Sequence, residues 1–332
     1  MLSTPYQMLK APYPISIKKS ITKMKMKTKH IFFVAMLVLL ASCNDYKVFE
    51  DEQYKNVFAL ISNSDNINSK VFSLDSTSAT GYITLSMGGS NTITEDVTIQ
   101  LVEDPSLIDT YNKNIYDQNV SKYAKRLPQS NYDITSHQCV IKAGQRGGII
   151  PIVIRPAGLS PDSTYFIPIR VDSYNRYEMN PRKNYMLYRV YIKNKWAVGD
   201  GTTVYTLRGK RRALPSGNEI SLPGTKIMAP ISKNSVRVMA GNETYEASIP
   251  SLERAAMILT IADDRKVTIT PMRDLQITQI DGDKEYPNTF IYENDGYNHY
   301  KTFLLHYRYT LDGNTYEMKE ELRMQYNKDN EK

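Results

Sequence analysis

Tyrosines and short polar residues alternate in one segment near the end of the chain, and these side chains are suited to binding sugars. The residues concerned are Tyr292, Asn294, Asp295, Tyr297, Asn298 and Tyr300. A sugar presents C–H faces that pack on aromatic rings, and hydroxyls that pair with amides and carboxylates, so tyrosine beside asparagine supplies both contacts. The segment therefore predicts a shallow ligand-binding loop, although a solvated loop between strands accounts for the same residues.

Tyrosine is frequent in this chain, with 25 tyrosines against 8 phenylalanines and 1 tryptophan. Most of these tyrosines fall in runs typical of half-buried strands, where tyrosine is favoured, so their abundance alone does not predict a ligand. The single tryptophan, Trp196, lies where we expect the chain to pass from one domain to the next. Packing at that junction is the favoured interpretation of Trp196, and a platform for sugar stacking is the alternative.

No residues in the chain have the spacing of a known catalytic or metal site. The sequence has no Gly-x-Ser-x-Gly elbow, no His-Glu-x-x-His, no glycine-rich phosphate loop and no Cys/His metal spacing. The nearest acid and base candidates are Glu293, Asp295 and His299. The alternating carboxylates Asp281, Asp283 and Glu285 lack the longer spacing of a calcium loop and favour a hairpin turn. We therefore predict no enzyme activity, no metal and no cofactor.

The N-terminal segment predicts export from the cytoplasm. Basic residues cluster from Lys18 to Lys29, an apolar run of 11 residues follows from Ile31 to Ala41, and small residues end directly on Cys43. This order is typical of a secretory signal peptide, and the run is far shorter than the roughly 20 apolar residues that cross a bilayer. Residues 1–42 are the predicted signal peptide, within which residues 1–23 are a candidate upstream-start artefact.

The small residues that precede Cys43 resemble a bacterial lipobox. The resemblance implies that the thiol of Cys43 receives lipid, palmitate among its acyl chains, and that this cysteine becomes the new N-terminus. Stable anchoring takes two lipid signals, which a multiply acylated cysteine exceeds. Residues 43–56 then form a polar tether, whose acidic residues resemble the surface-export signal of Bacteroidota lipoproteins. We expect a lipid-anchored protein of the outer membrane that faces the cell surface.

The predicted signal peptide also accounts for the charge of the chain. It holds seven lysines and no acidic residue, whereas the whole chain has a formal net charge of +7. The mature chain is therefore neutral, which removes the basic excess that would have suggested a nucleic-acid partner. If Cys43 carries lipid, Cys139 has no cysteine partner within the chain. The fold must then rest on its core without a disulfide.

Short runs of β-forming residues between turn residues predict an all-β fold. The runs expected in a first domain, 57–195, are 57–61, 82–86, 97–102, 139–142, 149–154, 165–171 and 185–193. Those expected in a second domain, 196–328, are 203–208, 235–239, 256–261, 266–270, 275–280, 302–310 and 315–326. Apolar residues on one face predict a single helix over 106–116. Asp312-Gly313 between two alternating segments predicts a tight hairpin.

Scattered residues in each half match a known pair of domains. In the first half they are Leu107, Tyr111-Asn112, Leu127-Pro128, Tyr132, Ile141, Ala143-Gly144, Leu159, Tyr165 to Ile169 and Ser173. In the second half they are Phe303 to Tyr309, Gly313, Tyr316 and Leu322. The chain thus resembles Bacteroidota outer-membrane lipoproteins of polysaccharide-utilisation loci. The resemblance implies an N-terminal Ig-like β-sandwich with one short helix insertion, then a lipocalin-like antiparallel β-barrel or sandwich.

The resemblance also implies a non-catalytic role in capturing glycans at the cell surface. The expected partners are the outer membrane through the lipid anchor, an oligo- or polysaccharide, and a glycan transporter complex of the outer membrane. A fimbrial or adhesin subunit is the alternative, but Bacteroidota pilins are freed by an arginine-specific cut near the mature N-terminus. No arginine occurs between Cys43 and Arg126. A glycan hydrolase that uses the segment from Glu293 to His299 is the third possibility.

Overall fold

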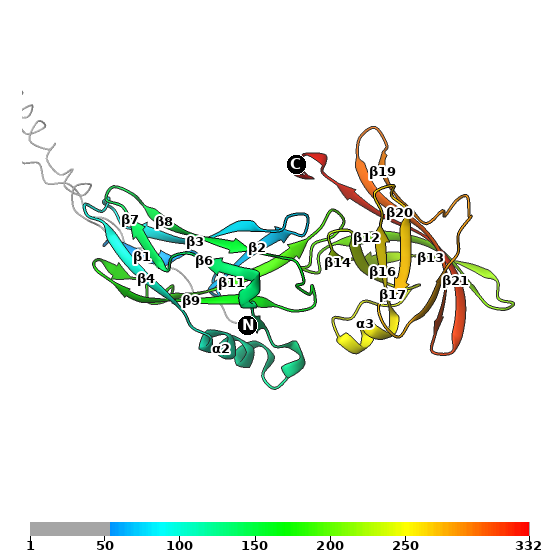
Figure 1. The fold of residues 1–332 in the computed structure, drawn as a ribbon, viewed down its shortest axis with the longest axis horizontal. Helices are drawn as coiled ribbons and strands as arrows, with labels where there is room; N and C mark the ends of the chain where they lie inside the picture. The colour runs from blue at the N-terminus through cyan, green and yellow to red at the C-terminus, as the bar shows by residue number, and fades with distance from the viewer. Residues whose placement is uncertain (1–53, 332) are drawn as a thin grey trace, which may run out of the picture. The chain divides into compact units, whose positions relative to one another are not determined.

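The computed structural model describes residues 54–331, which belong to one compact unit (Figure 1). The predicted signal peptide, Cys43 and most of the predicted tether lie outside the described residues. Among residues 54–331, no helix combines the length and the apolar character that crossing a membrane needs.

Two sheets form the N-terminal half of the described chain, with strand orders β10-β1-β3-β8-β6 and β2-β11-β9-β4-β7. The short strand β5 also pairs with β9 in the second sheet. The strands are β1 (Val57–Leu60), β2 (Ile67–Ser73), β3 (Ala79–Gly88), β4 (Val97–Glu103), β5 (Lys125–Arg126), β6 (Tyr132–Ile134), β7 (Gln138–Ile141), β8 (Gly147–Ile154), β9 (Tyr165–Tyr174), β10 (Glu178–Met179) and β11 (Tyr185–Lys193). Two short 3-10 helices, η2 (Val120–Lys122) and η3 (Gln129–Asn131), lie among them.

The core of this half lies between the two sheets. Alternation along the strands produces this core: in β8, Ile150, Ile152 and Ile154 are buried, while Ile149 and Pro151 are exposed. Successive side chains of a strand point to opposite faces, so one face of β8 supplies the core and the other meets solvent. The inward-facing side chains of both sheets form one continuous apolar cluster.

The single helix predicted from the sequence is present as α2 (Ser106–Tyr116). Asp104 accepts hydrogen bonds from the Ser106 backbone N–H at 3.1 Å and from its hydroxyl at 2.6 Å, just before the helix begins. The Tyr111 ring packs edge-on against Phe166 of β9, with 4.9 Å between centroids. This contact gives β9 a second buried face, which explains why its sequence is apolar at consecutive positions (Figure 1).

Two further sheets form the C-terminal half, with strand orders β13-β12-β21-β20-β18 and β14-β15-β16-β17. The strand β19 also pairs with β20. The elements are β12 (Val204–Ala213), β13 (Glu219–Ile227), β14 (Ala229–Ser232), β15 (Ser235–Met239), α3 (Ile249–Ala255), β16 (Ala256–Ile261), β17 (Val267–Pro271), β18 (Gln276–Gln279), β19 (Thr289–Asn294), β20 (His299–Leu311), β21 (Asn314–Tyr326) and the 3-10 helix η4 (Lys328–Glu331). The all-β fold class predicted from the sequence is confirmed, and we keep 57–195 and 196–328 as the proposed limits of the two domains.

The hairpin predicted at Asp312-Gly313 joins the two longest strands of the described chain. Asp312 and Gly313 both have positive φ, at 48° and 77°, which is the backbone that a two-residue turn of this type requires. Strands β20 and β21 then pair without a break from Leu311 opposite Asn314 to His299 opposite Tyr326. The hairpin is therefore long enough to extend beyond the apolar core of its domain.

Several elements escaped the sequence analysis because polar residues interrupt their patterns. Strand β2 is polar along most of its length and forms a sheet edge, where it pairs in parallel with β11. Strand β13 is likewise an exposed edge strand, paired along its full length with β12. The short helix α3 contains Pro250 in its first turn, a position that tolerates proline. Strand β19 belongs to the segment that we had predicted to be a loop.

A buried ion pair crosses the C-terminal core. Lys226 donates to Glu320 over 2.5 Å and to the Met239 carbonyl over 2.9 Å, while Tyr307 donates to Glu320 over 3.1 Å. Burial lowers the pKa of Lys226 and raises the pKa of Glu320, and the contact between the two charges opposes both shifts. Glu320, which interrupts the apolar face of β21 in the sequence, thus points into the core and has a partner there.

Candidate functional site

The inner face of the β19-β20-β21 sheet changes from core to open surface along three successive cross-strand rows. The rows are Phe290–Phe303–Leu322, Tyr292–Lys301–Met324 and Asn294–His299–Tyr326. Every residue of the first row is buried in the core. Residues two apart on a strand share a face, so the second and third rows continue that face outward. The three strands therefore place side chains beyond the core, at the end of the domain where β19 is labelled in Figure 1.

The whole second row lines a hollow of about 570 Å³. Its other residues come from the linker between β11 and β12, from β11 itself and from the segment around Asp75. Trp196 lies in this linker and packs edge-on against Phe290 of the first row, with 5.8 Å between centroids. The hollow is thus lined by a sheet face on one side and by the linker on another.

A second hollow, of about 630 Å³, adjoins the third row. His299 and Tyr326 line it together with Tyr297, Asn298, Gln325 and the segment 327–329. Asn298 accepts a hydrogen bond from the Gln325 side-chain amide over 2.9 Å, so the hairpin turn is tied to β21 at the edge of this hollow. Amides therefore lie beside the aromatic rings in this hollow.

Aromatic rings connect the two hollows in a continuous series. Phe290 packs edge-on against Tyr292 with 4.9 Å between centroids, and the Tyr292 ring lies 5.8 Å from that of Tyr326. The Tyr326 ring lies 5.9 Å from His299. We call Trp196, Tyr292, Tyr326 and His299 the aromatic ridge. Ring contacts of this kind fix the orientation of each side chain, so the ridge offers a preformed apolar surface.

The linker that carries Trp196 is held by the side chain of Asn194. Its amide donates to the carbonyls of Ser232 and Ser235 at 2.8 and 2.9 Å, and its oxygen accepts from the backbone N–H groups of Trp196 and Ala197. Trp196 itself is 7% exposed and belongs to the C-terminal core cluster. Both interpretations of this tryptophan therefore retain a basis, because it is packed in the core and also borders a hollow.

The predicted loop residues divide into those that reach a hollow and those that hold the turn. Tyr292 is 40% exposed on β19, and Tyr297 is 95% exposed at the turn. Asp295 accepts from the backbone N–H groups of Asn298 at 2.8 Å and Tyr297 at 3.0 Å, and from the Tyr300 hydroxyl at 2.9 Å. These bonds, led by the one from Asn298, lower the pKa of Asp295 to about 2. Asp295 and Tyr300 thus build the turn that presents the others.

The remaining predicted residues also take structural positions. Asn294 accepts from the backbone N–H of Gly296 over 2.8 Å, and Asn298 bonds to Gln325. On the outer face of the sheet, the Arg323 guanidinium lies 3.7 Å from the centroid of the Tyr300 ring. The ligand-binding role of these residues stays a prediction. The structure brings Trp196 and Tyr292 to one hollow, and Tyr297 and Asn298 to the other.

The acid and base candidates of this segment lie on different faces of the sheet. Glu293 pairs across the strands with Tyr300, and it contacts Arg323 and Thr302. His299 lies opposite Asn294 and Tyr326 in the third row. Residues at odd and even positions of a strand point to opposite faces, so Glu293 and His299 do not converge on one substrate atom. Glu293 and His299 are therefore not placed to act as an acid and base pair, while Asp295 holds the turn between them.

The carboxylates of the Asp281 turn are also held by protein partners. Asp283 accepts from the backbone N–H groups of Glu285 and Tyr286 and pairs with Lys319 at 2.6 Å. Asp281 accepts from the side-chain amides of Gln279 and Asn288. Across residues 54–331, no group of three or more His, Cys, Asp or Glu residues is arranged to hold a metal ion. Burial raises the pKa of the Cys139 thiol to about 11.

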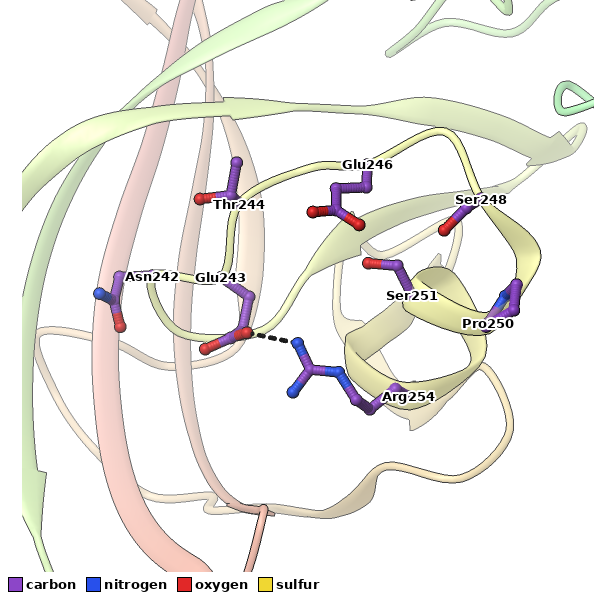
Figure 2. Close-up of a pocket in the computed structure, with 8 residues that line it drawn as sticks. All are labelled: Asn242, Glu243, Thr244, Glu246, Ser248, Pro250, Ser251 and Arg254. Atoms are coloured by element: carbon purple, nitrogen blue, oxygen red, sulfur yellow. Dashed lines mark hydrogen bonds and ion pairs between the residues drawn. The ribbon is translucent and has the colours of Figure 1, made fainter.

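A third hollow, of about 610 Å³, lies beside α3 and differs from the ridge in its lining (Figure 2). Its residues are Asn242, Glu243, Thr244, Glu246, Ser248, Pro250, Ser251 and Arg254. Arg254 bonds to Glu243 at 2.9 Å and to Asp312 at 2.8 Å, so its charge already has two partners. Figure 2 shows the hydroxyls of Ser248 and Ser251 near Glu246, with no aromatic ring among the lining side chains. We call this the polar hollow.

Four residues that the sequence did not mark as binding residues also line the two hollows: Lys301, Met324, Tyr326 and His299. The alternating pattern of β20 and β21 contained them, because Lys301 and Met324 continue the inward-facing positions of Phe303 and Leu322. The strand predicted at 302–310 begins after Lys301 and His299, which in the structure belong to β20, whereas Met324 and Tyr326 lie within the strand predicted at 315–326 but had no binding role assigned. If the alternation of inward-facing residues is continued along each strand beyond the buried positions, the residues of the second and third cross-strand rows can be identified from the sequence.

Two family models match the chain in succession. One, described as an N-terminal domain, matches residues 49–178, and the other, described as C-terminal, matches residues 184–323. No curated protein matches the chain. The two matches follow the same order along the chain as the two pairs of sheets, so each pair of sheets corresponds to one matched domain.

Solved structures from Bacteroides have the same fold over most of their length. A protein of unknown function from Bacteroides ovatus has a TM-score of 0.64 at 14% identity, covering 81% of this chain and 94% of that one. A multidomain Bacteroides ovatus protein has a TM-score of 0.61 at 12% identity, covering 81% and 94%. The chain therefore has the two-domain all-β fold of these Bacteroides structures. An auxiliary nutrient binding protein from Bacteroides thetaiotaomicron has a TM-score of 0.56 at 14% identity, covering 80% and 94%.

Proposed function

We propose that this chain is a non-catalytic glycan-binding protein of the cell envelope, which binds saccharide across the aromatic ridge. The observation that carries the proposal is the inner face of β19-β20-β21, which leaves the core and continues as rings and amides beside two hollows. Stacking of sugar C–H faces on the rings and hydrogen bonds to the amides are the contacts this surface supports.

Binding at such a surface is shallow, because the hollows are open and the rings lie on one side of the ligand. Weak single contacts become effective when receptors are held together on a surface, since each further contact is then intramolecular. The proposed lipid on Cys43 would supply that condition by holding the protein in the outer membrane, facing the cell surface. A glycan transporter complex is the proposed partner that receives the captured saccharide. The nutrient-binding description of one structural relative supports this proposal.

A glycan panel tests the proposal with the full mature chain. We expect at least one oligosaccharide to bind, and Tyr326→Ala and Tyr292→Ala each to weaken it about 10-fold, or ~1.4 kcal/mol. Tyr82→Ala is the matched control, because Tyr82 is a similarly exposed tyrosine on β3. Equal weakening by the control variant, or no binding to any glycan, would contradict the proposal. Turnover of a bound oligosaccharide would contradict its non-catalytic part.

The anchor has its own test. Cys43→Ala should release the protein from the membrane fraction of its native host, whereas Cys139→Ala should leave fractionation unchanged because that thiol is buried in the core. Mass spectrometry of the native protein should find acyl chains on Cys43. An unmodified Cys43, or unchanged fractionation of the Cys43→Ala variant, would exclude the lipid anchor without touching the binding proposal.

A further inference from the structure

The charged residues around the aromatic ridge are mostly cationic. The cations that line its hollows or lie over its rings are Lys193, Lys195, Lys301, Lys328 and Arg265, against the two carboxylates of Asp75 and Asp329. The mature chain carries no formal net charge, since the predicted signal peptide holds the whole excess of +7. The positive charge at the ridge is therefore a local feature of this surface.

Two of these cations are placed directly on the rings. The Arg265 guanidinium carbon lies 5.6 Å from the centroid of the Tyr292 ring. The Lys301 ammonium lies 5.0 Å from the centroid of the Tyr326 ring, and this side chain is 5% exposed. A cation held over a tyrosine face keeps its charge at the apolar surface instead of extending into solvent. The Lys301 ammonium also donates to the Lys195 carbonyl, so of these two cations it is Arg265 that a ligand stacked on Tyr292 would meet.

The exposed lysines Lys193 and Lys195 extend the positive charge along the first hollow. Lys193 ends β11 and Lys195 belongs to the linker, and both line the hollow together with Trp196. Neither lysine has an ion-pair partner among residues 54–331. The polar hollow beside α3 has the opposite balance, with Glu243 and Glu246 against Arg254. The cationic character thus distinguishes the ridge from the other hollow of similar size.

We propose that the saccharide bound at the aromatic ridge is acidic, carrying carboxylate or sulfate groups along its chain. An acidic sugar offers an apolar C–H face and an anionic group in one unit, so it can stack on Tyr292 or Tyr326 while its charge meets the neighbouring cations. A neutral sugar would use the rings and amides alone. This inference rests on the proposed glycan-binding function and specifies its ligand class.

Matched pairs of oligosaccharides test the inference by titration calorimetry on the mature chain. Each uronate oligosaccharide is paired with its carboxyl-reduced form, and each sulfated one with its desulfated form, so the two anionic groups are distinguished. We expect the acidic member of a bound pair to bind about 10-fold more tightly at low ionic strength, and salt to reduce that advantage. Equal or tighter binding of the neutral member would overturn the inference while leaving the proposed function intact.

Charge variants locate the effect. Lys193→Gln combined with Lys195→Gln should weaken the acidic member about 3- to 10-fold and leave the neutral member unchanged. Lys210→Gln is the control, because Lys210 is an exposed lysine on β12, away from the residues that line either hollow. A preference for acidic members that survives the double variant would overturn the site assignment. Failure of every pair member to bind would remove the proposed function, and this inference with it.

Discussion

The aromatic ridge and the polar hollow enclose similar volumes but are built differently. The ridge hollows measure about 570 and 630 Å³, and the polar hollow about 610 Å³. The ridge consists mainly of rings on three paired strands, and sheet register and ring contacts set the positions of these rings. The polar hollow is lined by the loop 242–248 and by α3, a helix of seven residues. In Figure 1 the two regions lie at different ends of the C-terminal half, near the labels β19 and α3.

The contrast shows that volume alone does not identify a binding surface. In the polar hollow, Arg254 bonds to Glu243 and Asp312, so a ligand would have to compete with bonds already formed (Figure 2). At the ridge, the Tyr292 ring remains 40% exposed although it packs against Phe290 and Tyr326. An exposed ring that is already positioned loses little conformational entropy when a ligand stacks on it.

The largest expected effect concerns the core that both regions share. Strand β21 carries Tyr326 of the ridge at one end and Tyr316 at the other. The Arg211 guanidinium lies over the Tyr316 ring and bonds to Asn242 of the polar hollow. Glu320 lies between these two tyrosines and pairs with Lys226 in the core. Because Glu320→Ala should leave Lys226 charged and buried, we expect the free energy of unfolding of the domain to fall by about 3–5 kcal/mol. Urea unfolding measures this loss. The loss should affect the ridge and the polar hollow alike.

Two further variants control that measurement. Glu321→Ala removes the neighbouring carboxylate, which faces Arg208 at 3.6 Å near the surface, and should cost no more than about 1 kcal/mol. Replacing both charges, with Lys226→Met and Glu320→Leu, should recover part of the lost stability because no unpaired charge remains buried. A Glu320→Ala variant as stable as Glu321→Ala would show that the buried pair does not support the core.

A double-mutant cycle on the ridge has the next largest expected effect. The Tyr292 and Tyr326 rings lie 5.8 Å apart, so a ligand that stacks on both should couple them. The combined Tyr292→Ala and Tyr326→Ala variant should lose less binding free energy than the two single losses added, by about 0.5–1.5 kcal/mol. Calorimetry with the bound oligosaccharide measures the coupling. Strict additivity would indicate that the two hollows bind separate ligands.

Breaking the polar hollow should leave saccharide binding intact. Arg254→Ala removes the two bonds to Glu243 and Asp312, which are partly exposed, and should cost about 1 kcal/mol of stability or less. The affinity for the oligosaccharide bound at the ridge should not change. Loss of saccharide binding in this variant, with the fold intact by circular dichroism, would reverse our assignment of the two regions.

The smallest expected effect concerns the turn that presents Tyr297. Hydrogen bonds from Asn298, Tyr297 and Tyr300 lower the pKa of Asp295 from 3.8 to about 2. Because the folded pKa lies below the unfolded one, the contribution to stability is complete above about pH 4 and is lost as the pH falls through 2. An NMR titration of the Asp295 carboxyl carbon should show its midpoint near pH 2. A midpoint near 3.8 would mean that the turn does not hold this carboxylate.

Much of the fold followed from local patterns, and the exceptions have physical causes. The helix over 106–116 and the strand 256–261 lie at the predicted residues, because in each element the spacing of the apolar residues follows the side chains that are buried. Strands β2 and β13 were missed because edge strands can be polar while their backbone still pairs. In the predicted loop, Tyr292 and Tyr300 proved to lie on strands whose side chains had passed the end of the core.

The sequence by itself determined the all-β class, the helix, the tight turn at Asp312-Gly313 and the tyrosine-rich segment, because each depends on side chains close together in the chain. Only the tertiary structure decided which tyrosines face a hollow and which hold a turn. It brought Trp196 to the same hollow as Tyr292, placed the Tyr326 ring against Tyr292, and gave the inward-facing Glu320 its partner Lys226. These pairings depend on sheet register and on the path of the linker, which set contacts between residues far apart in the chain.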